Sequence, residues 1–342
     1  MKALILEGIT NLRENRQPLK FADMPVPSIA DEEILVKVST CGVCHTELDE
    51  IEGRAPPPRF PAILGHQIVG RVIDCGARAN KFKINERVGI GWIYWACGKC
   101  PQCLAGGENL CADFQATGRD AQGGYAEYIK IHQNFAFFIP EIFSDSQAAP
   151  LLCAGAIGYR SLRLANLADG QSLGLTGFGA SAHMVLKLSR YLYPQSEIFV
   201  FARAARERNF ALDLGATWAG DTTNEPPGKI QTIIDTTPVW KPVVEALKNL
   251  APGGRLVINA IRKEDADKEY LLEIDYARHL WQEKEIKSVA NVTRLDIEEF
   301  LNLAAKIPII PQIEEYPLEE ANRALAELKE GKIKGAKVLR VN

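Results

Sequence analysis

The chain lacks the long apolar runs that membrane proteins need. No stretch of its 342 residues approaches the ~18 continuous apolar residues of a membrane span. In the N-terminal segment MKALILEGIT, the apolar run ends at Glu7, so it is too short for a signal-peptide core. We therefore expect no membrane partner and a cytosolic location.

The chain also lacks an excess of basic charge. It has 40 Lys and Arg against 43 Asp and Glu, with a formal net charge of -3. Nucleic-acid binding needs a concentrated basic face, which this balance does not favour. We expect no nucleic-acid partner. The length, with 46% hydrophobic residues, exceeds what one small core organises, so two domains are the natural expectation.

The first ~150 residues contain short strand patterns separated by Gly, Pro and Asp or Asn, which indicate an irregular β-barrel. The clearest of these patterns are Ile34–Ser39, Gly70–Asp74 and Glu86–Ile90.

From about Asp169 the pattern changes to alternating strands and amphipathic helices, which is typical of βαβ units in a parallel sheet. The expected strands are 171–178, 197–202, 230–236 and 255–260, and the expected helices are 180–193, 206–214 and 243–250. Two further helices, 296–305 and 318–330, and a last strand, 337–341, follow.

Four of the eight cysteines lie within 15 residues (111 − 97 + 1). In a large chain without an export signal, cysteines spaced so closely bind metal more often than they form disulfides. Four thiolates with no open position describe a structural zinc site that holds a small lobe together. Reduced loop cysteines and an iron–sulfur cluster are the alternatives. The four cysteines are Cys97, Cys100, Cys103 and Cys111.

A second set of possible ligands is scattered along the chain. Cys44 follows an expected strand, His66 lies in LGHQIVG, and Cys153 lies in LLCAG. One imidazole and two thiolates would leave a zinc ion one vacancy for a substrate oxygen. Spacing alone makes this only a suggestion, because a single buried Cys or His is usually part of the core.

The strings CGVCHTE, GHQIVGRV, ACGKCPQCLAGGENLC, GGYAEY and AAPLLCAG occur in this order. Together they resemble the zinc-containing alcohol dehydrogenases of the medium-chain dehydrogenase/reductase family over essentially the whole chain. The resemblance implies an α/β plus β fold, with a GroES-like catalytic domain and an inserted Rossmann cofactor domain. The implied domains are 1–152 with the zinc lobe at about 92–115, then 153–287, and a segment 288–342 that returns to the catalytic domain.

The resemblance also implies residue roles by position. Cys44, His66 and Cys153 match the catalytic zinc ligands, and the four clustered cysteines match the structural ones, which gives two Zn²⁺ per chain. His45 matches a contact to the cofactor pyrophosphate, and Thr46 matches the hydroxyl that binds the substrate oxygen. Glu47 matches the carboxylate that orients the histidine ligand. Cys41 and Cys75 are left as packing residues.

A glycine-rich turn joins the strand 171–178 to the helix 180–193 and predicts a nicotinamide dinucleotide site. Its first two glycines allow a tight turn and close approach of the pyrophosphate, and an alanine in third place keeps the helix close to the strand. A plain turn of small residues is the alternative. The turn consists of Gly177, Gly179, Ala180, Ser181 and Ala182 around Phe178.

The end of the next strand favours NADP over NAD. The acid that would bind the adenosine ribose is absent, and Arg203, Arg206 and Arg208 follow. Guanidinium groups bind a 2′-phosphate well, which an acid would repel. The alternative is that these arginines are the solvated start of the next helix.

Three positions depart from many relatives in the family. Asp49 stands where a histidine often ends the proton relay, and Gln67 stands where a glutamate is common. Ala55 replaces a tryptophan found in small pockets, while Trp92 remains at a wall position, so the pocket should accept more than ethanol.

The resulting prediction is reversible oxidation of primary or secondary alcohols to aldehydes or ketones with NADP or NAD, by a homodimer or homotetramer. Zinc would stabilise the alkoxide, and Thr46 would pass its proton on. The alternatives are a zinc-free quinone or enoyl reductase on the same fold and a non-catalytic, zinc-binding redox sensor.

Overall fold

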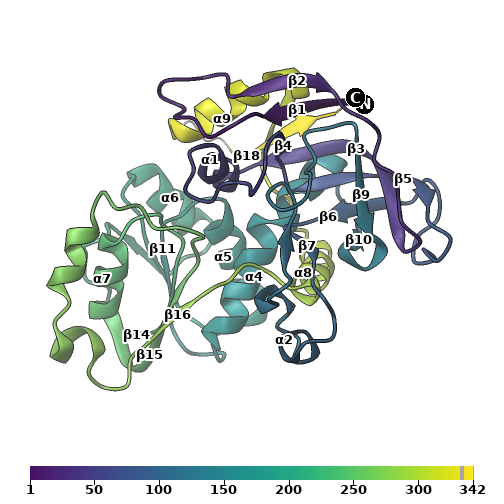
Figure 1. The fold of residues 1–342 in the computed structure, drawn as a ribbon. Helices are drawn as coiled ribbons and strands as arrows, with labels where there is room; N and C mark the ends of the chain where they lie inside the picture. The colour runs from purple at the N-terminus through teal and green to yellow at the C-terminus, as the bar shows by residue number, and fades with distance from the viewer. Residues whose placement is uncertain (332–334, 342) are drawn as a thin grey trace. The chain divides into compact units, whose positions relative to one another are not determined.

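The computed structural model describes residues 1–331 and 335–341. The chain divides into two compact units, which we call unit 1 (Met1–Ala156 and Val292–Asn342) and unit 2 (Ile157–Asn291) (Figure 1). Unit 2 is thus inserted in the sequence of unit 1. Each boundary lies a few residues after the one expected from the sequence.

Unit 1 is built mainly from antiparallel sheets. The largest has the order β10-β6-β5-β3-β18-β17 with β9 also on β3, and a smaller one has the order β2-β1-β4. The strands of the large sheet are β3 (Glu33–Val43), β5 (Ile68–Cys75), β6 (Arg87–Ile90), β9 (Tyr128–His132), β10 (Ala136–Phe138), β17 (Ile313–Pro317) and β18 (Ala336–Arg340). The others are β1 (Lys2–Leu6), β2 (Leu19–Asp23), β4 (Ala62–Ile63), and the pair β7 (Ile93–Trp95) and β8 (Gln115–Ala116).

The C-terminal segment completes the large sheet of unit 1. Strand β18 pairs antiparallel with β3, so that Leu339 lies opposite Cys41. Both residues are fully buried, and this apolar pairing holds the last strand beside the strand that leads into Cys44. The helices of unit 1 include α1 (His45–Ile51), α2 (Pro101–Leu104), α3 (Asp145–Ala148), α8 (Arg294–Lys306) and α9 (Ala321–Lys329). The helix expected at Leu318 begins with a 3-10 turn, and its α-helical part starts at Ala321.

Unit 2 contains one parallel six-stranded sheet in the order β13-β12-β11-β14-β15-β16. Every residue of β11 and β12 is buried, as expected of strands covered on both faces. The predicted Rossmann arrangement is confirmed. The strands are β11 (Leu173–Thr176), β12 (Ile198–Phe201), β13 (Trp218–Gly220), β14 (Ile230–Asp235), β15 (Leu250–Ile258) and β16 (Glu285–Ser288). The helices are α4 (Ala154–Ala165, beginning in unit 1), α5 (Ala180–Leu192), α6 (Ala205–Asp213) and α7 (Lys241–Asn249).

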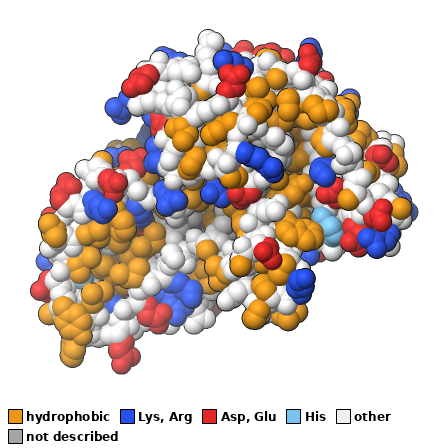
Figure 2. All heavy atoms as spheres, in the orientation of Figure 1, with side chains coloured by type: hydrophobic (Ala, Val, Ile, Leu, Met, Phe, Trp, Pro, Cys, Tyr) orange, Lys and Arg blue, Asp and Glu red, His pale blue; other side chains and the backbone are white. Residues whose placement is uncertain are grey.

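Unit 2 has an open sheet edge and several exposed apolar side chains. Among the described residues β16 pairs with β15 alone, and all four of its residues are exposed. Large apolar side chains of the segment between β15 and β16 are also exposed: Leu272 by 89%, Tyr276 by 63% and Trp281 by 58%. Figure 2 shows apolar side chains gathered over the part of unit 2 that contains α7. Of the helices in the described ranges, none has the length and apolar character to cross a membrane.

Candidate metal and cofactor sites

Cys44 is placed by the junction between β3 and α1. It is the N-cap residue of α1, and its thiol accepts a hydrogen bond from the Thr46 N–H at 3.4 Å. The Glu47 carboxylate reaches back to the Cys44 N–H at 2.7 Å, which completes a capping box. The cap fixes both the thiol and the carboxylate at the first turn of the helix.

His66 follows a glycine at which any side chain would be strained. Gly65 has a φ of +95°, and a Cβ there would lie 2.5 Å from the Tyr125 ring. The Nδ1 of the following His66 lies 2.7 Å from the Glu47 Oε1, an ion-pair contact, and both side chains are essentially inaccessible to solvent. Because Nδ1 is engaged, Nε2 is the nitrogen left to bind a metal.

The three predicted catalytic ligands converge within unit 1. His66 Nε2 lies 3.6 Å from the Cys44 Sγ and 3.2 Å from the Cys153 Sγ, and all three ligand atoms lie within 4.8 Å of one another. Ligands at 2.0–2.3 Å from a tetrahedral zinc ion are separated by about 3.5 Å. The donor set and its spacing therefore fit zinc with one open position.

The electrostatics of this site favour a cation. A hydrogen bond with Cys153, burial and the nearby Glu47 carboxylate raise the pKa of Cys44. Burial opposes protonation of His66, but Glu47 and Cys44 outweigh it and raise the pKa of the imidazole. Without a metal these groups hold protons, so metal binding must displace them.

The predicted pocket residues are buried in unit 1. Trp92 meets His66 edge to face with ring centroids 4.9 Å apart, and Thr46 and Ala55 are also buried. Asp49 is committed elsewhere: its Oδ1 accepts from Arg54 Nε at 2.5 Å, and its carbonyl accepts from the Ala55 N–H at 3.0 Å. Asp49 thus holds the turn that carries Ala55.

One carboxylate near the ligands was not singled out from the sequence. Glu50 is fully buried on α1, and neither of its carboxylate oxygens has a hydrogen-bond partner among the residues that the structure describes. Burial and the neighbouring Glu47 raise the pKa of Glu50. The i, i+3 spacing from Glu47 was the available signal, since it places both side chains on one helix face. Gln67 is also buried, and its side chain packs against the backbone of Gly42.

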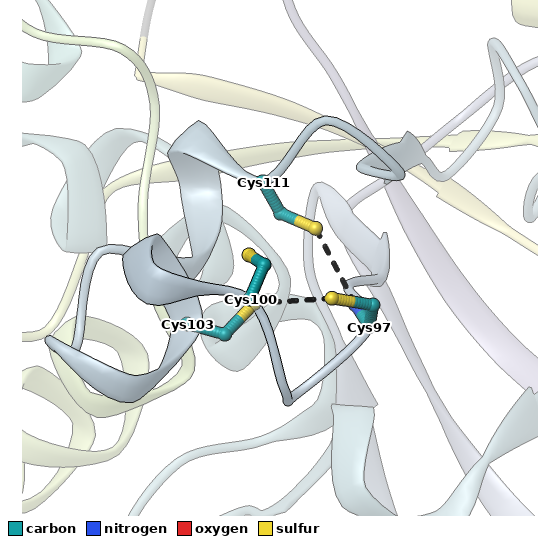
Figure 3. Close-up of side chains that lie close together, drawn as sticks. All are labelled: Cys97, Cys100, Cys103 and Cys111. Carbon is teal, nitrogen blue, oxygen red and sulfur yellow. Dashed lines mark hydrogen bonds between the residues drawn. The ribbon is translucent and has the colours of Figure 1, made fainter.

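The four clustered cysteines converge in a separate lobe of unit 1 (Figure 3). The Cys97 N–H donates to the Cys111 Sγ at 3.5 Å, and the Sγ atoms of Cys97 and Cys103 are 4.0 Å apart. The N–H groups of Lys99 and Cys100 lower the pKa of Cys97 to about 7. The Sγ atoms of the four cysteines all lie within 4.8 Å of one another, which suits a closed tetrahedral zinc site.

The large apolar side chains between the clustered cysteines are exposed. Leu104 is 76% exposed and Leu110 is 53% exposed. The Glu108 carboxylate instead accepts from the Arg294 N–H at 2.6 Å and pairs with its guanidinium at 2.7 Å. This contact ties the lobe to the start of α8, and the thiols remain the groups that can cross-link it internally.

We expect Cys100→Ser to remove one zinc ion per chain and to lower the melting temperature by about 5–10 °C, because the lobe has no core to replace the cross-link. Elemental analysis and differential scanning calorimetry measure the two effects. Cys75→Ser, whose thiol lies outside both clusters, is the matched control and should keep the full zinc content. A Cys100→Ser protein with unchanged zinc content would contradict the assignment.

The glycine-rich turn lies at the carboxyl end of β11 in unit 2. Gly177 has a φ of +77°, and a Cβ there would lie 2.9 Å from the Thr237 side chain. Gly179 is the N-cap of α5 and has no side chain to cover the first N–H groups, which include those of Ala180 and Ser181. Ala182 is fully buried. The turn thus leaves helix N–H groups available to a pyrophosphate.

The arginines after β12 differ in what they do. Arg208 donates to the carbonyls of Ala202 and Arg203 at 2.8 and 2.7 Å and lies 3.7 Å from the Asp221 carboxylate. It therefore holds the loop in place. Arg203 and Arg206 are exposed, so their guanidinium groups can face a ligand at this strand end.

Comparison with known proteins supports one family throughout. Residues 30–141 match the family described as "Alcohol dehydrogenase GroES-like domain". The chain is 43% identical over 327 residues to a "Probable alcohol dehydrogenase AdhA" of Mycobacterium tuberculosis, with 94% of this chain and 92% of that protein covered. An "Alcohol dehydrogenase" of Geobacillus stearothermophilus is 30% identical over 339 residues, with coverage of 96% and 98%.

Solved structures share the fold at lower identity. CAD from Helicobacter pylori, complexed with NADP(H), has a TM-score of 0.85 at 22% identity, covering 99% of this chain and 97% of that one. An NAD-dependent alcohol dehydrogenase has a TM-score of 0.88 at 21% identity, with both chains covered completely. The predicted combination of a GroES-like domain with a Rossmann domain is confirmed.

Proposed function

We propose that this chain, which belongs to the zinc-containing alcohol dehydrogenases of the medium-chain dehydrogenase/reductase family, binds its substrate where Cys44, His66 and Cys153 converge. That convergence is the observation that carries the proposal. The reaction is the reversible oxidation of primary or secondary alcohols with NAD(P). A zinc-free reductase would not need this ligand set, and a redox sensor would not need the glycine turn next to Thr176.

We assign the zinc ligands by donor chemistry. Cys44, His66 and Cys153 would hold the catalytic zinc, and the four-cysteine lobe would hold the structural one. Zinc would polarise the substrate hydroxyl as a Lewis acid, and the nicotinamide would accept the hydride. With its Oε1 2.7 Å from the His66 Nδ1, the Glu47 carboxylate would favour one orientation of the imidazole, in which Nε2 faces the two thiols.

Thr46 is the proposed proton acceptor. It lies on the first turn of α1, two residues from Cys44, and a hydroxyl can accept and donate at once. Asp49 is poorly suited to accept the proton from Thr46, because its carboxylate already pairs with Arg54. We propose that Thr46 passes the proton on toward solvent, and a bound cofactor would supply a ribose hydroxyl as a further acceptor. His45, next to Cys44, is proposed to contact the cofactor pyrophosphate.

We propose that the pocket accepts alcohols larger than ethanol. Ala55 provides a small wall side chain, held in position by Asp49, while Trp92 provides an apolar wall beside His66. Relatives of this chain include a "Probable cinnamyl alcohol dehydrogenase" of Populus deltoides, 32% identical over 244 residues. Aromatic primary alcohols therefore join the straight-chain and branched alcohols as proposed substrates.

A steady-state screen tests the substrate proposal. Straight-chain, branched and aromatic alcohols, and the matching aldehydes and ketones, are compared by kcat/KM with NAD(P) as cofactor. We expect aromatic or longer alcohols to exceed ethanol. Ala55→Trp should shift the preference back toward ethanol, because the ring would fill the pocket. Highest kcat/KM for ethanol in the wild type would contradict an enlarged pocket.

We propose that NADP is preferred over NAD. Solved relatives of the fold include proteins bound to each cofactor, so this chain's own strand end carries the argument. Ala202 stands where an acid would bind the ribose, and Arg203 and Arg206 are exposed beside it. A 2′-phosphate would meet positive charge there and no carboxylate at the strand end itself.

We expect Arg203→Ala to lower kcat/KM for NADP about tenfold and to leave the value for NAD unchanged, because only NADP carries the phosphate. Ala202→Asp should shift the preference toward NAD. Arg190→Ala removes an exposed arginine at the other end of α5 and serves as the control. Higher kcat/KM for NAD than for NADP in the wild type would overturn the preference.

We propose that the enzyme assembles as a homodimer or homotetramer. The unpaired edge of β16 and the exposed apolar side chains of Leu272, Tyr276 and Trp281 support this, because both kinds of surface favour association. Trp281→Glu should lower the mass measured by light scattering, whereas an unchanged mass would exclude this surface as the contact.

We propose that the enzyme is located in the cytosol. All eight cysteines are free, which suits a reducing compartment.

A further inference from the structure

A buried carboxylate lies where the strand order in the parallel sheet of unit 2 reverses. Strands β12 and β13 follow β11 on one side, and β14, β15 and β16 follow on the other. Ligands of such sheets bind outside the carboxyl ends of the strands at this switch point. Asp235, the last residue of β14, lies beside Thr176 of β11 and is fully buried. Thr176 donates to its Oδ1 at 2.6 Å, and the glycine turn begins at the next residue.

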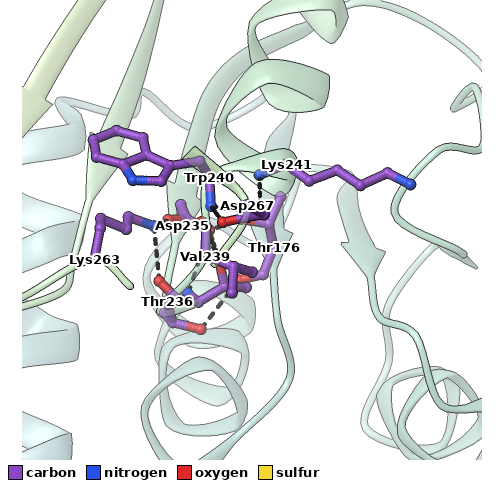
Figure 4. A network of polar contacts seen from close by, with 9 residues as sticks. Thr176, Asp235, Thr236, Val239, Trp240, Lys241, Lys263 and Asp267 are labelled. Carbon is purple, nitrogen blue, oxygen red and sulfur yellow. Dashed lines mark hydrogen bonds and ion pairs between the residues drawn. The ribbon is translucent and has the colours of Figure 1, made fainter. Parts of the chain in front are cut away.

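The charge of Asp235 is balanced by a lysine from a different loop. Lys263 lies in the segment 259–267 after β15, and its ammonium group pairs with the Asp235 Oδ2 (Figure 4). The same ammonium donates to the carbonyls of Thr237 and Val239 at 2.7 and 3.1 Å. Its side chain is 8% exposed. One buried cation therefore binds the carboxylate and two carbonyls of the segment 236–240, which we call the switch loop.

The switch loop in turn forms one side of the glycine turn. The Thr237 hydroxyl donates to the Asp235 Oδ1 at 2.8 Å, and the Thr236 hydroxyl donates to the Thr176 carbonyl at 3.1 Å. A Cβ on Gly177 would lie 2.9 Å from Thr237 and 3.0 Å from Thr236. Any displacement of the loop would therefore change the space beside the turn.

The segment that carries Lys263 also holds the far end of the switch loop. The Asp267 carboxylate accepts from the N–H groups of Trp240 and Lys241 at 2.9 and 2.8 Å, which caps the start of α7. Glu264 N–H donates to the Pro238 carbonyl at 2.7 Å. The loop is thus held at three points by polar contacts, and the Lys263 ammonium is its central one.

We infer that Asp235 and Lys263 are positioning residues for the nicotinamide half of the cofactor, an inference that rests on the proposed dinucleotide site. The adenosine half belongs at the end of β12, where Arg203 lies. The pyrophosphate belongs at the glycine turn after β11, so the nicotinamide half must cross toward β14. The ion pair holds the switch loop in place. It therefore also fixes the surface that the nicotinamide half of the cofactor would contact.

Binding measurements on the whole enzyme test the pair. Lys263→Met keeps the length of the side chain but removes its charge and donors. Fluorescence titration with NADPH and NADH reports the whole cofactor, and titration with 2′,5′-ADP and AMP reports the adenosine half alone. We expect the Kd of the favoured dinucleotide to rise at least about tenfold, while the Kd of its adenosine half stays within about twofold of wild type.

A matched variant and a double variant separate positioning from stability. Lys284 also donates to two carbonyls, those of Leu247 and Arg278 at 2.9 Å each, but it precedes β16 and so lies at the amino end of the parallel sheet, away from Asp235. Lys284→Met should leave every Kd unchanged. Asp235→Asn with Lys263→Met removes both charges, so thermal stability should recover relative to Lys263→Met while dinucleotide binding stays weak.

The outcomes are distinct. An unchanged dinucleotide Kd in Lys263→Met would overturn the inference, as would an equal loss for dinucleotide and adenosine half. Recovery of dinucleotide affinity in the double variant would also overturn it, because the carbonyls would still lack their donor. A wild-type enzyme that binds neither dinucleotide would instead reject the cofactor site itself.

Discussion

Cys153→Ser is expected to reduce turnover by roughly a thousandfold or more and to lose one of two zinc ions. The thiol lies 3.2 Å from the His66 Nε2, and its removal leaves the site with two strong ligands. A Lewis acid contributes several kcal/mol to the transition state, which corresponds to such a factor. Steady-state rates and elemental analysis on the same preparation measure both effects.

The lobe should be unaffected in this variant. Because the four-cysteine site is separate, Cys153→Ser should melt near the wild-type temperature, in contrast to Cys100→Ser. The pair of variants therefore distinguishes a catalytic from a structural metal. Full turnover in Cys153→Ser, or loss of both zinc ions, would refute the assignment of Cys153 to an independent catalytic site.

Thr46→Val is expected to reduce alcohol oxidation by about 10²–10⁴-fold, the usual range for a general acid–base step. Valine keeps the shape of threonine but has no hydroxyl, so it cannot pass a proton. Thr46→Ser should retain much of the rate. Zinc content should be unchanged in both variants, because neither removes a thiol or an imidazole. A fully active Thr46→Val enzyme would mean that the substrate loses its proton directly to water.

The pH dependence of Asp49→Asn decides whether Asp49 takes part in the relay. If this carboxylate were the next acceptor, its loss would depress oxidation most at low pH, where other bases are scarce. The ion pair with Arg54 already occupies this carboxylate, so we expect an unchanged pH–rate profile. A selective loss of rate at low pH would restore Asp49 to the relay.

Local patterns in the sequence were sufficient to predict two parts of this protein, the glycine turn and the cysteine cluster. The glycine turn at Gly177 depends on a strand, a turn and a helix that are adjacent in the chain, and period and glycine spacing report such neighbours directly. The cysteines from Cys97 to Cys111 are close enough that any compact loop brings them together. The resemblance to the alcohol dehydrogenase family extended this to the fold and to the ligand set.

Contacts between distant residues needed the folded chain. His66 lies 22 positions from Cys44 and 87 from Cys153, and spacing alone made their convergence only a suggestion. Lys263 and Asp235 are 28 positions apart, and Arg294 and Glu108 are 186 apart. No periodicity links such pairs, because their approach is set by the pairing of whole strands and by loops that many sequences could close. The topology therefore decides which group pairs with a buried charge. In the sequence, nothing distinguishes Lys263 from a lysine on the surface. In the folded chain, the parallel pairing of β14 with β15 places the loop that carries Lys263 over Asp235.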